Sequence, residues 1–374
     1  MPSPDRADLV IRAPRILTMS GAGIVEDGCV AVAGGSIIAV GRSCPPSERE
    51  LNLAHHAVMP GLVDSHAYTY MLAVPPSASP EDFRPGADLL YWSALFAYTT
   101  MLLSGVTAVR DSAHDPAVLA EAARRSGIRA IPSMLVDRRG ATPAGWPELT
   151  VRAVDPGAAP PPGARVFLDA SELDPLPSGQ ALQSAGISAV VGAFAPLGDL
   201  RRLWDAGIGV VVTPSQALRG RWSGGVLKMR SVGVSAALGT GARSLRALPN
   251  LLEEARIAMH MDAMLGFDPN PQFLLESMTS SAGAVLGERV GRIEPGFRAD
   301  IVALDLRRPH LRFPSGDLLS LVVSSATRGD FDYVIVDGNV VVEEGRHKWL
   351  YLEGIARKLE SIIGSSWAGG PGGK

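Results

Sequence analysis

The chain contains very little cysteine, and this scarcity limits the kinds of site that it can form. Only Cys29 and Cys44 are present among 374 residues. Two cysteines this close together in the sequence are too few for a disulfide framework or a cysteine metal cage. Such cysteine usage is typical of a reducing compartment, so we expect a cytoplasmic protein.

Histidine and lysine are missing from long stretches. No histidine or cysteine lies between His114 and His260, and the first lysine is Lys228. The middle of the chain therefore offers no imidazole or thiolate to a metal ion, and the part before Lys228 offers no side-chain amine.

Excess charge and long apolar runs are also absent. Lys and Arg number 35 against 38 Asp and Glu, the net charge is -3, and no basic tract occurs, so we expect no nucleic-acid partner. The first 19 residues lack the apolar region of a secretory signal. The uncharged stretch Leu89–Val109 is diluted by polar residues and changes period at Gly105, which predicts a buried helix over Leu89–Ser104 followed by a strand, and no membrane partner.

Apolar residues are abundant and follow two patterns along the chain. They make up 46% of it, enough for a large folded core in about two domains. Residues 1–58 read as short strands broken by turns, and strands return at 300–305, 333–337 and 340–343. Between them, strands alternate with amphipathic helices, as in a parallel α/β barrel. We predict a composite β-sandwich domain from residues 1–58 and 297–374, and a (β/α)8 barrel of the TIM type over residues 59–296.

Eight segments are candidate barrel strands, the fourth being the weakest because residues 137–163 are compressed and proline-rich. They are Gly61–Asp64, Val106–Arg110, Ile128–Leu135, Leu149–Val154, Arg165–Leu168, Ile187–Val191, Ile208–Thr213 and Val234–Leu238. The final ten residues, SSWAGGPGGK, are predicted to be a frayed tail.

Several motifs resemble one known family. VMPGLVDSHAY, LLSGVTAVRDSAHD, VSAALGTGARSLRALPNLLEEARIAM, SSAGAVLGERVGRIEPGFRADIVALD and FDYVIVDGNVVVEEG are similar to segments of the metal-dependent amidohydrolase superfamily, in its cytosine deaminase, chlorohydrolase and imidazolonepropionase-like branches. The resemblance covers nearly the whole chain. It implies a barrel with a composite sandwich, and hydrolysis of C–N bonds in a small molecule by a metal-bound water at the barrel mouth.

The metal ligands that the resemblance implies are mostly replaced. The family places two histidines one residue apart after the first strand, and this chain has His66 and Tyr68. The fifth-strand histidine aligns with Asp169, the sixth with Gly192, and the eighth-strand aspartate with Gly241. Because catalytic zinc takes about three protein ligands, we expect no zinc or other cofactor. Harder cations that accept carboxylates stay open as an alternative.

Side chains at the expected mouth could still carry out proton transfer. His66 is the best general acid or base, or a relic held by hydrogen bonds. Tyr68 could donate a hydrogen bond or fill vacated space, and Asp169 with Glu172 could form an acid pair or be solvated. Asp111 and His114 are weaker candidates, suggested by their spacing alone.

Arginines in the expected strand-end loops suggest an anionic ligand, because guanidinium groups bind carboxylate and phosphate. Against this, arginine replaces lysine almost throughout the chain. The candidate ligand-binding residues, with one aromatic residue in a glycine-flanked turn, are Arg110, Arg138, Arg219, Arg221, Trp222 and Arg243.

Three functions remain open from the sequence. The first is a divergent, metal-independent enzyme that acts on a small molecule through His66, Tyr68, Asp169 and Glu172. The second is a non-catalytic protein that binds a small, anionic metabolite or a protein partner. The third is an intact metallohydrolase with unusual ligands. A homo-oligomer is compatible with each of them.

Overall fold

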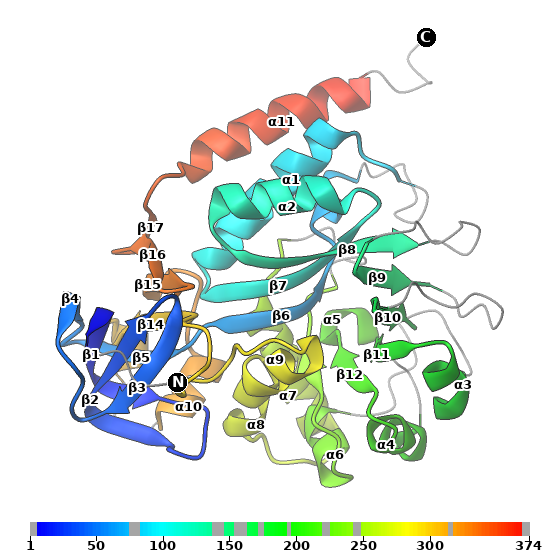
Figure 1. Ribbon diagram of the computed structural model, residues 1–374. Helices are drawn as coiled ribbons and strands as arrows, with labels where there is room; N and C mark the ends of the chain where they lie inside the picture. The colour runs from blue at the N-terminus through cyan, green and yellow to red at the C-terminus, as the bar shows by residue number, and fades with distance from the viewer. Residues whose placement is uncertain are drawn as a thin grey trace.

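Two β-sheets organise the molecule. The computed structural model describes residues 6–74, 83–136, 146–152, 163–170, 176–192, 196–218, 225–241, 248–312 and 317–368. An eight-stranded parallel sheet curls into a nearly closed barrel, and a separate nine-stranded mixed sheet lies beside it (Figure 1). This is the α/β barrel with a composite sheet that the sequence predicts.

The eight barrel strands follow one another in chain order, and every predicted strand is found. They are β6 (Leu62–Ala67), β7 (Val106–Ala113), β8 (Arg129–Val136), β9 (Glu148–Val151), β10 (Arg165–Asp169), β11 (Ile187–Val191), β12 (Gly209–Val212) and β13 (Ala237–Leu238). Inward-facing residues of alternate positions, including Val63, Phe167 and Val211, form one apolar cluster with Leu286 of a following helix. Because both faces of a barrel strand are covered, these strands are short runs of mostly apolar residues, and such runs between turn signals were the basis of their prediction.

Short contacts close the barrel between its last and first strands. The backbone N–H of Gly241 donates to the carbonyl of His66 at 2.9 Å. The carboxylate of Asp64 accepts from the backbone N–H of Thr240 at 3.0 Å and from its hydroxyl at 2.7 Å. These bonds join β6 to the residues after β13.

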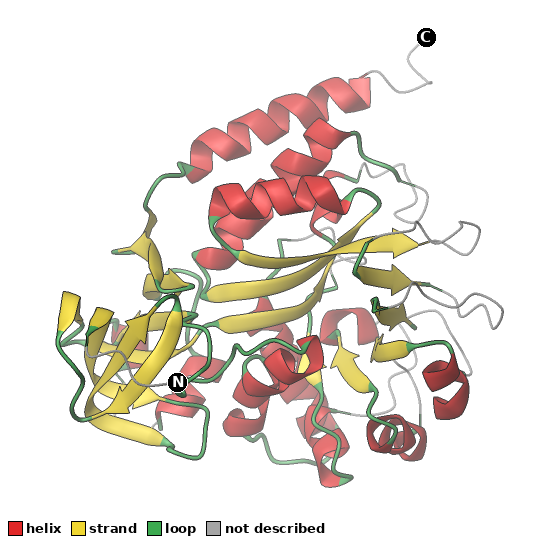
Figure 2. Ribbon diagram, in the orientation of Figure 1, coloured by secondary structure: helices red, strands yellow, loops and turns green. Residues whose placement is uncertain are grey.

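Helices cover the outside of the barrel, as Figure 2 shows in red. They are α1 (Ala87–Leu102), α2 (Pro116–Ser126), α3 (Gly179–Ser184), α4 (Leu197–Asp205), α5 (Pro214–Ala217), α6 (Val226–Ser231), α7 (Leu251–Met264), α8 (Pro271–Ser277) and α9 (Ser280–Leu286), with a 3-10 turn at η1 (Thr69–Ala73). The predicted buried helix is α1, which ends just before Gly105. Gly105 has φ +81°, and a Cβ there would lie 2.6 Å from the Phe331 ring. No helix in the described ranges is long and apolar enough to cross a membrane.

The mixed sheet brings both ends of the chain together. Its strands are β1 (Ala7–Leu17), β2 (Ile24–Ala33), β3 (Ser36–Gly41), β4 (Ser47–Asn52), β5 (His56–Pro60), β14 (Ile301–Asp305), β15 (Phe331–Val336), β16 (Asn339–Glu343) and β17 (Arg346–His347). The two halves join where β5 pairs antiparallel with β14, with Met59 opposite Val302. The domain boundaries at residues 58 and 297 stay a prediction. Residue 58 lies within strand β5, which runs continuously to Pro60.

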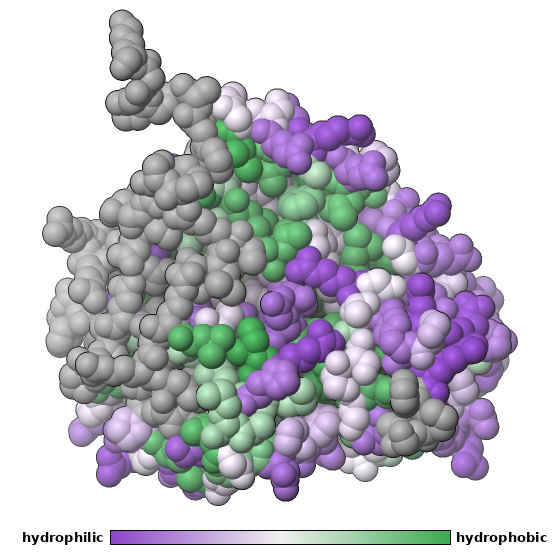
Figure 3. Space-filling view, turned by 180° about the vertical axis from the view of Figure 1, so that it is seen from behind, coloured by the Kyte–Doolittle hydropathy of each residue, from purple (hydrophilic) through white to green (hydrophobic). Residues whose placement is uncertain are grey.

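The C-terminal segment differs from the sequence prediction. Instead of a frayed tail from residue 365, helix α11 (Leu352–Ala368) runs through its first four residues. Ile355, Leu359 and Ile362 recur at helical spacing and face α1. Figure 3 shows hydrophobic residues gathered in the upper part of the rear face, below a hydrophilic top edge where α11 lies. The remaining elements are η2 (Pro309–Leu311) and α10 (Leu318–Ser324).

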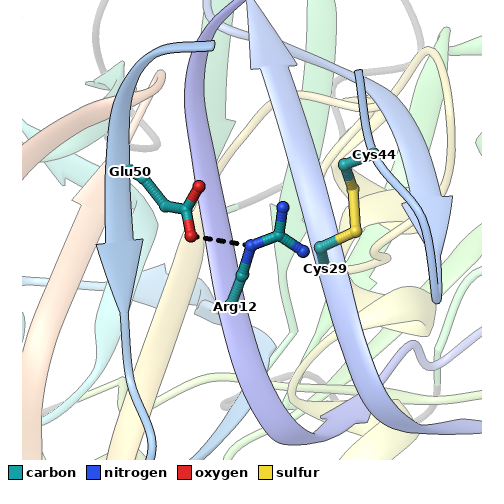
Figure 4. Close-up of a disulfide and its surroundings, with 4 residues drawn as sticks. All are labelled: Arg12, Cys29, Cys44 and Glu50. Carbon is teal, nitrogen blue, oxygen red and sulfur yellow. Dashed lines mark hydrogen bonds and ion pairs between the residues drawn. A yellow bond between two sulfur atoms is a disulfide. The ribbon is translucent and has the colours of Figure 1, made fainter. Parts of the chain in front are cut away.

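The two cysteines are bonded to each other, which the cysteine count alone did not predict. Cys29 of β2 pairs with Gly41 at the end of β3, so the hairpin carries Cys44 back beside it (Figure 4). The two Cα atoms are 6.1 Å apart. A nearby ion pair joins Arg12 of β1 to Glu50 of β4 at 2.7 Å. The disulfide removes the support that cysteine usage gave to a reducing compartment, and the cytoplasmic location stays a prediction.

Candidate active site

Three of the four main candidate residues meet at the carboxyl-terminal mouth of the barrel. His66 lies near the end of β6, Tyr68 comes directly after that strand, and Asp169 ends β10. All three are buried, with Asp169 the most exposed at 4%. Parallel strands place their carboxyl ends on the same side of a barrel, which is why residues so far apart in sequence come together. Glu172, the fourth candidate, lies outside the described residues.

A hydrogen bond and a ring contact connect these three side chains. The Tyr68 hydroxyl donates to Oδ2 of Asp169 at 2.6 Å. The His66 and Tyr68 rings meet edge to face, with their centroids 4.6 Å apart. Asp169 therefore holds the Tyr68 ring, and the Tyr68 ring in turn packs against the imidazole.

Asp64 supports His66 from within the same strand, and it was not among the predicted site residues. Its carboxylate accepts the backbone N–H of His66 at 3.2 Å in addition to the two bonds from Thr240. Complete burial raises the pKa of Asp64 to about 7, against the opposing effect of these hydrogen bonds. The signal available in the sequence was a charged residue, Asp64, directly after the apolar residues Leu62 and Val63 of a predicted barrel strand.

Gln216 occupies the space beside Gly241. Gly241 has φ +60°, and a Cβ built there would lie 2.8 Å from the side-chain amide carbon of Gln216. The Gln216 carbonyl oxygen accepts from the Thr213 hydroxyl at 2.8 Å, which orients the amide. Gly239 is equally confined, because its Cβ would lie 2.8 Å from the backbone nitrogen of His66. At this edge of the mouth the backbone approaches His66 too closely for a side chain.

Helix α5, which carries Gln216, is held from outside the barrel by Glu254. The Glu254 carboxylate of α7 accepts the backbone N–H of Ser215 at 2.8 Å. Burial is the main cause that raises the pKa of Glu254 to about 8, and the charge of Asp64 adds to it. Nothing in the sequence pattern distinguished this glutamate from a solvent-exposed helix residue.

Comparison with known proteins finds similarity to one family. An amidohydrolase family model matches residues 218–341. A 5-methylthioadenosine/S-adenosylhomocysteine deaminase of Pelotomaculum thermopropionicum is 26% identical over 407 residues, covering 90% of this chain and 94% of that protein. A second such deaminase, from Symbiobacterium thermophilum, is 28% identical over similar shares of the two chains. The chain is therefore similar to members of the amidohydrolase superfamily.

Two solved structures share the fold over nearly the whole chain. An adenosine deaminase from Xanthomonas campestris with bound zinc superposes with a TM-score of 0.81 at 20% identity, covering 97% of this chain and all of that one. The atrazine chlorohydrolase of Arthrobacter aurescens, complexed with zinc, gives a TM-score of 0.77 at 18% identity, with 95% of this chain covered. The fold that the sequence motifs imply is therefore confirmed.

Asp111 of β7 is fixed by residues of η1 and α1. It accepts from the backbone N–H of Thr69 at 3.0 Å and from the hydroxyls of Thr69 and Tyr98 at 2.5 and 2.8 Å. Burial raises its pKa to about 6. His114 lies half-buried just beyond β7. That Asp111 orients His114 stays a prediction.

The prediction that Arg110 lies in a ligand-binding loop at the mouth is wrong. It belongs to β7 rather than to a strand-end loop, and its side chain is fully buried inside the barrel. Its guanidinium donates to Thr150, Ser133 and the carbonyl of Leu149, at 2.7, 2.9 and 2.7 Å. It also lies 3.8 Å above the centre of the Phe167 ring. Arg110 is thus a packed part of the barrel interior. The other candidate ligand-binding residues, Arg138, Arg219, Arg221, Trp222 and Arg243, lie outside the described residues.

Proposed function

We propose that this amidohydrolase-fold protein is a metal-independent enzyme that acts on a small molecule at the barrel mouth. The observation that carries the proposal is the buried series Asp169, Tyr68 and His66, in which the 2.6 Å hydrogen bond fixes the phenol and the phenol packs against the imidazole. A positioned imidazole is the side chain best suited to proton transfer near neutral pH.

The proposed reaction is hydrolysis of a C–N bond. His66 accepts a proton from water as the water oxygen bonds to the substrate carbon, and the same imidazole returns that proton to the leaving nitrogen as the C–N bond breaks. Atoms balance, because the amine leaves with the proton and the carbon keeps the oxygen. Tyr68 and Asp169 act as positioning residues, and Asp64 fixes the backbone on which His66 lies.

The donors at the mouth support independence from the family's metal. His66 offers one imidazole, and Asp169 offers a carboxylate that already accepts the Tyr68 hydroxyl. At Gly241, which has no donor side chain, the neighbouring space is taken by the neutral Gln216 amide. Since catalytic zinc takes about three nitrogen, sulfur or oxygen ligands from the protein, the donors among the described residues of the mouth do not fit it.

The relatives indicate a substrate class. Their names describe deaminases of 5-methylthioadenosine and S-adenosylhomocysteine, and they match this chain over nine-tenths of its length. We therefore propose an adenine nucleoside or a similar amino-substituted heteroaromatic ring as substrate.

The test is turnover of these two nucleosides by the purified full chain, with ammonia release as readout and metal content measured in the same sample. We expect turnover that a strong chelator leaves unchanged and that His66→Gln abolishes. His260→Gln, an exposed histidine on α7, is the matched control and should retain turnover. Stoichiometric metal whose removal stops turnover would overturn the proposal and favour a metallohydrolase.

A second candidate function is binding without catalysis. The observation in its favour is that Asp169 already accepts a hydrogen bond from the Tyr68 hydroxyl, which leaves that carboxylate less able to act as a base. Nucleoside binding without ammonia release, with His66→Gln binding as tightly as the wild type, would favour this second function.

A further inference from the structure

A pocket lies against the mixed sheet, and none of its lining residues belongs to a barrel strand. Its volume is about 460 Å3, within the range of about 300–1,000 Å3 typical of small-molecule sites. It is formed where the turn before β5 meets the segment after β14 and helix α10. These elements lie at the left and lower left of Figure 1. The lining residues are Pro14, Arg15, Ala54, His55, Leu306, Arg307, Leu311, Arg312, Leu318 and Leu321.

The floor of the pocket is apolar and firmly held. Leu311, Leu318 and Leu321 are each at most 8% exposed, so their side chains belong to the packed interior. The backbone N–H of Leu306 donates to the carbonyl of His55 at 2.9 Å, which joins the two walls. The floor of the pocket is therefore shaped by fixed elements of the fold.

The rim of the pocket is cationic. Three arginines and one histidine line it, and none of its ten described lining residues is an aspartate or glutamate. This contrasts with the whole chain, in which acidic residues outnumber basic ones. A local excess of one charge attracts ligands of the opposite sign.

Neighbouring carboxylates neutralise only part of this charge. The Asp305 carboxylate accepts hydrogen bonds from Nε and Nη2 of Arg307, at 2.9 and 3.0 Å. Glu26 approaches Arg15 only to 3.8 Å. Arg312 has no ion-pair partner within the ranges that the structure describes. Arg15 and Arg312 thus retain guanidinium donors for a ligand.

We propose that this pocket binds a small anionic amphiphile, a molecule with one carboxylate or phosphate head and a short apolar body. Guanidinium groups bind both kinds of head through paired hydrogen bonds. The leucine floor would bury the apolar body, which stabilises the complex in proportion to the area removed from water. The proposal is independent of the chemistry at the barrel mouth.

The first test uses octanoate as the probe and isothermal titration calorimetry of the full chain. We expect octanoate to bind, and octanol and acetate to bind at least about tenfold more weakly, because each lacks one of the two recognised parts. Octyl phosphate distinguishes the two heads: tighter binding than octanoate assigns a phosphate head, and weaker binding a carboxylate. Absence of octanoate and octyl phosphate binding, or equal binding of octanol, would overturn the proposal.

The second test removes the free guanidinium groups. Arg15→Gln/Arg312→Gln should weaken octanoate binding at least about tenfold. Arg346→Gln/Arg357→Gln is the matched control, because it removes the same charge at two exposed arginines elsewhere and should bind like the wild type. Equal affinity in both double variants would show that general charge, rather than this pocket, attracts the probe.

A photoreactive octanoate analogue locates the site in the unmodified protein and does not depend on how any variant folds. We expect the label on the peptide that spans residues 306–321. Labelling confined to peptides of the barrel mouth would overturn the assignment.

Discussion

The buried carboxyl group of Asp64 makes the stability of the fold depend on pH. Burial raises the pKa of Asp64 from 3.8 to about 7, so the folded state keeps a proton that the unfolded chain releases. A group with a raised pKa stabilises the fold fully below its unfolded pKa, and this contribution is lost as pH rises through the folded value. Asp64 therefore makes the fold less stable as pH rises from 3.8 to about 7.

We predict that Asp64→Asn flattens this dependence, because asparagine does not ionise. The wild-type free energy of unfolding should fall more steeply over this window than that of the variant, by up to about 1.4 kcal/mol per pH unit. Urea unfolding at several pH values measures both slopes. Asp268→Asn, at an exposed position, should keep the wild-type slope. Parallel slopes for Asp64→Asn and the wild type would contradict the assignment.

The contribution of the Tyr68–Asp169 hydrogen bond to the free energy of unfolding can be measured by removing the Tyr68 hydroxyl. We predict that Tyr68→Phe destabilises the fold by about 1–3 kcal/mol, because it takes a donor from a buried carboxylate. Tyr351→Phe removes a similar bond to Glu353 at a tyrosine that is 63% exposed, and should change stability by less than about 0.5 kcal/mol. Chemical denaturation compares the two, and equal effects would show that the buried bond contributes little.

Single residues were predictable from sequence only where position along a strand determined their place. His66, Tyr68 and Asp169 lie at or just after the ends of predicted strands, so their meeting at one mouth could be expected. Asp64 and Gln216 gain their roles from contacts with residues distant in the sequence, which no local pattern encodes. Arg110 was misplaced because the sequence did not show that β7 continues to Ala113.

At the scale of elements, the segment after α9 approaches another backbone closely. Gly291 has φ +79°, and a Cβ there would lie 2.2 Å from the carbonyl oxygen of Thr279. Gly266 has nearly the same φ, +81°, with nothing within 4 Å of its Cβ position. Substitution of each glycine by alanine therefore separates two effects on stability. Both variants carry the backbone strain of a positive φ, and only the Gly291 variant adds a steric clash.

We predict that Gly291→Ala destabilises the fold by about 1–3 kcal/mol more than Gly266→Ala. Both substitutions force a positive φ on alanine, at a cost of about 1–2 kcal/mol, and only the first forces two backbones apart. Thermal unfolding of the two variants gives the difference directly. Equal melting temperatures of the two variants would mean that the backbone around Gly291 rearranges to accept the Cβ without loss of stability.

Elements were predictable where a periodic pattern had enough length. The eight barrel strands were identified because apolar residues cluster between turn signals, and even β9 was found despite its compressed surroundings. The disulfide was not, because pairing depends on how the β2–β3 hairpin returns Cys44 to Cys29. Helix α11 was missed at its end because the glycine-rich final residues suggested a tail from residue 365 onward.

At the scale of the whole molecule, the mixed sheet requires both ends of the chain. We predict that deletion of residues 299–374 abolishes cooperative unfolding, because β5 then loses its partner β14 and its share of the apolar core. Deletion of residues 351–374 removes α11 with its flanking residues but no strand, and should leave a cooperative transition at a lower temperature. Calorimetry distinguishes the two. A cooperative transition in the longer deletion would show that the barrel folds without the composite sheet.

The pairing of Met59 with Val302 also has a consequence for biosynthesis. Strand β5 leaves the ribosome early, yet its neighbour is translated only after the entire barrel. Until then one backbone edge stays exposed beside apolar side chains, a state prone to association with other nascent chains. Chaperone dependence during translation should therefore fall sharply once the ribosome has passed β14.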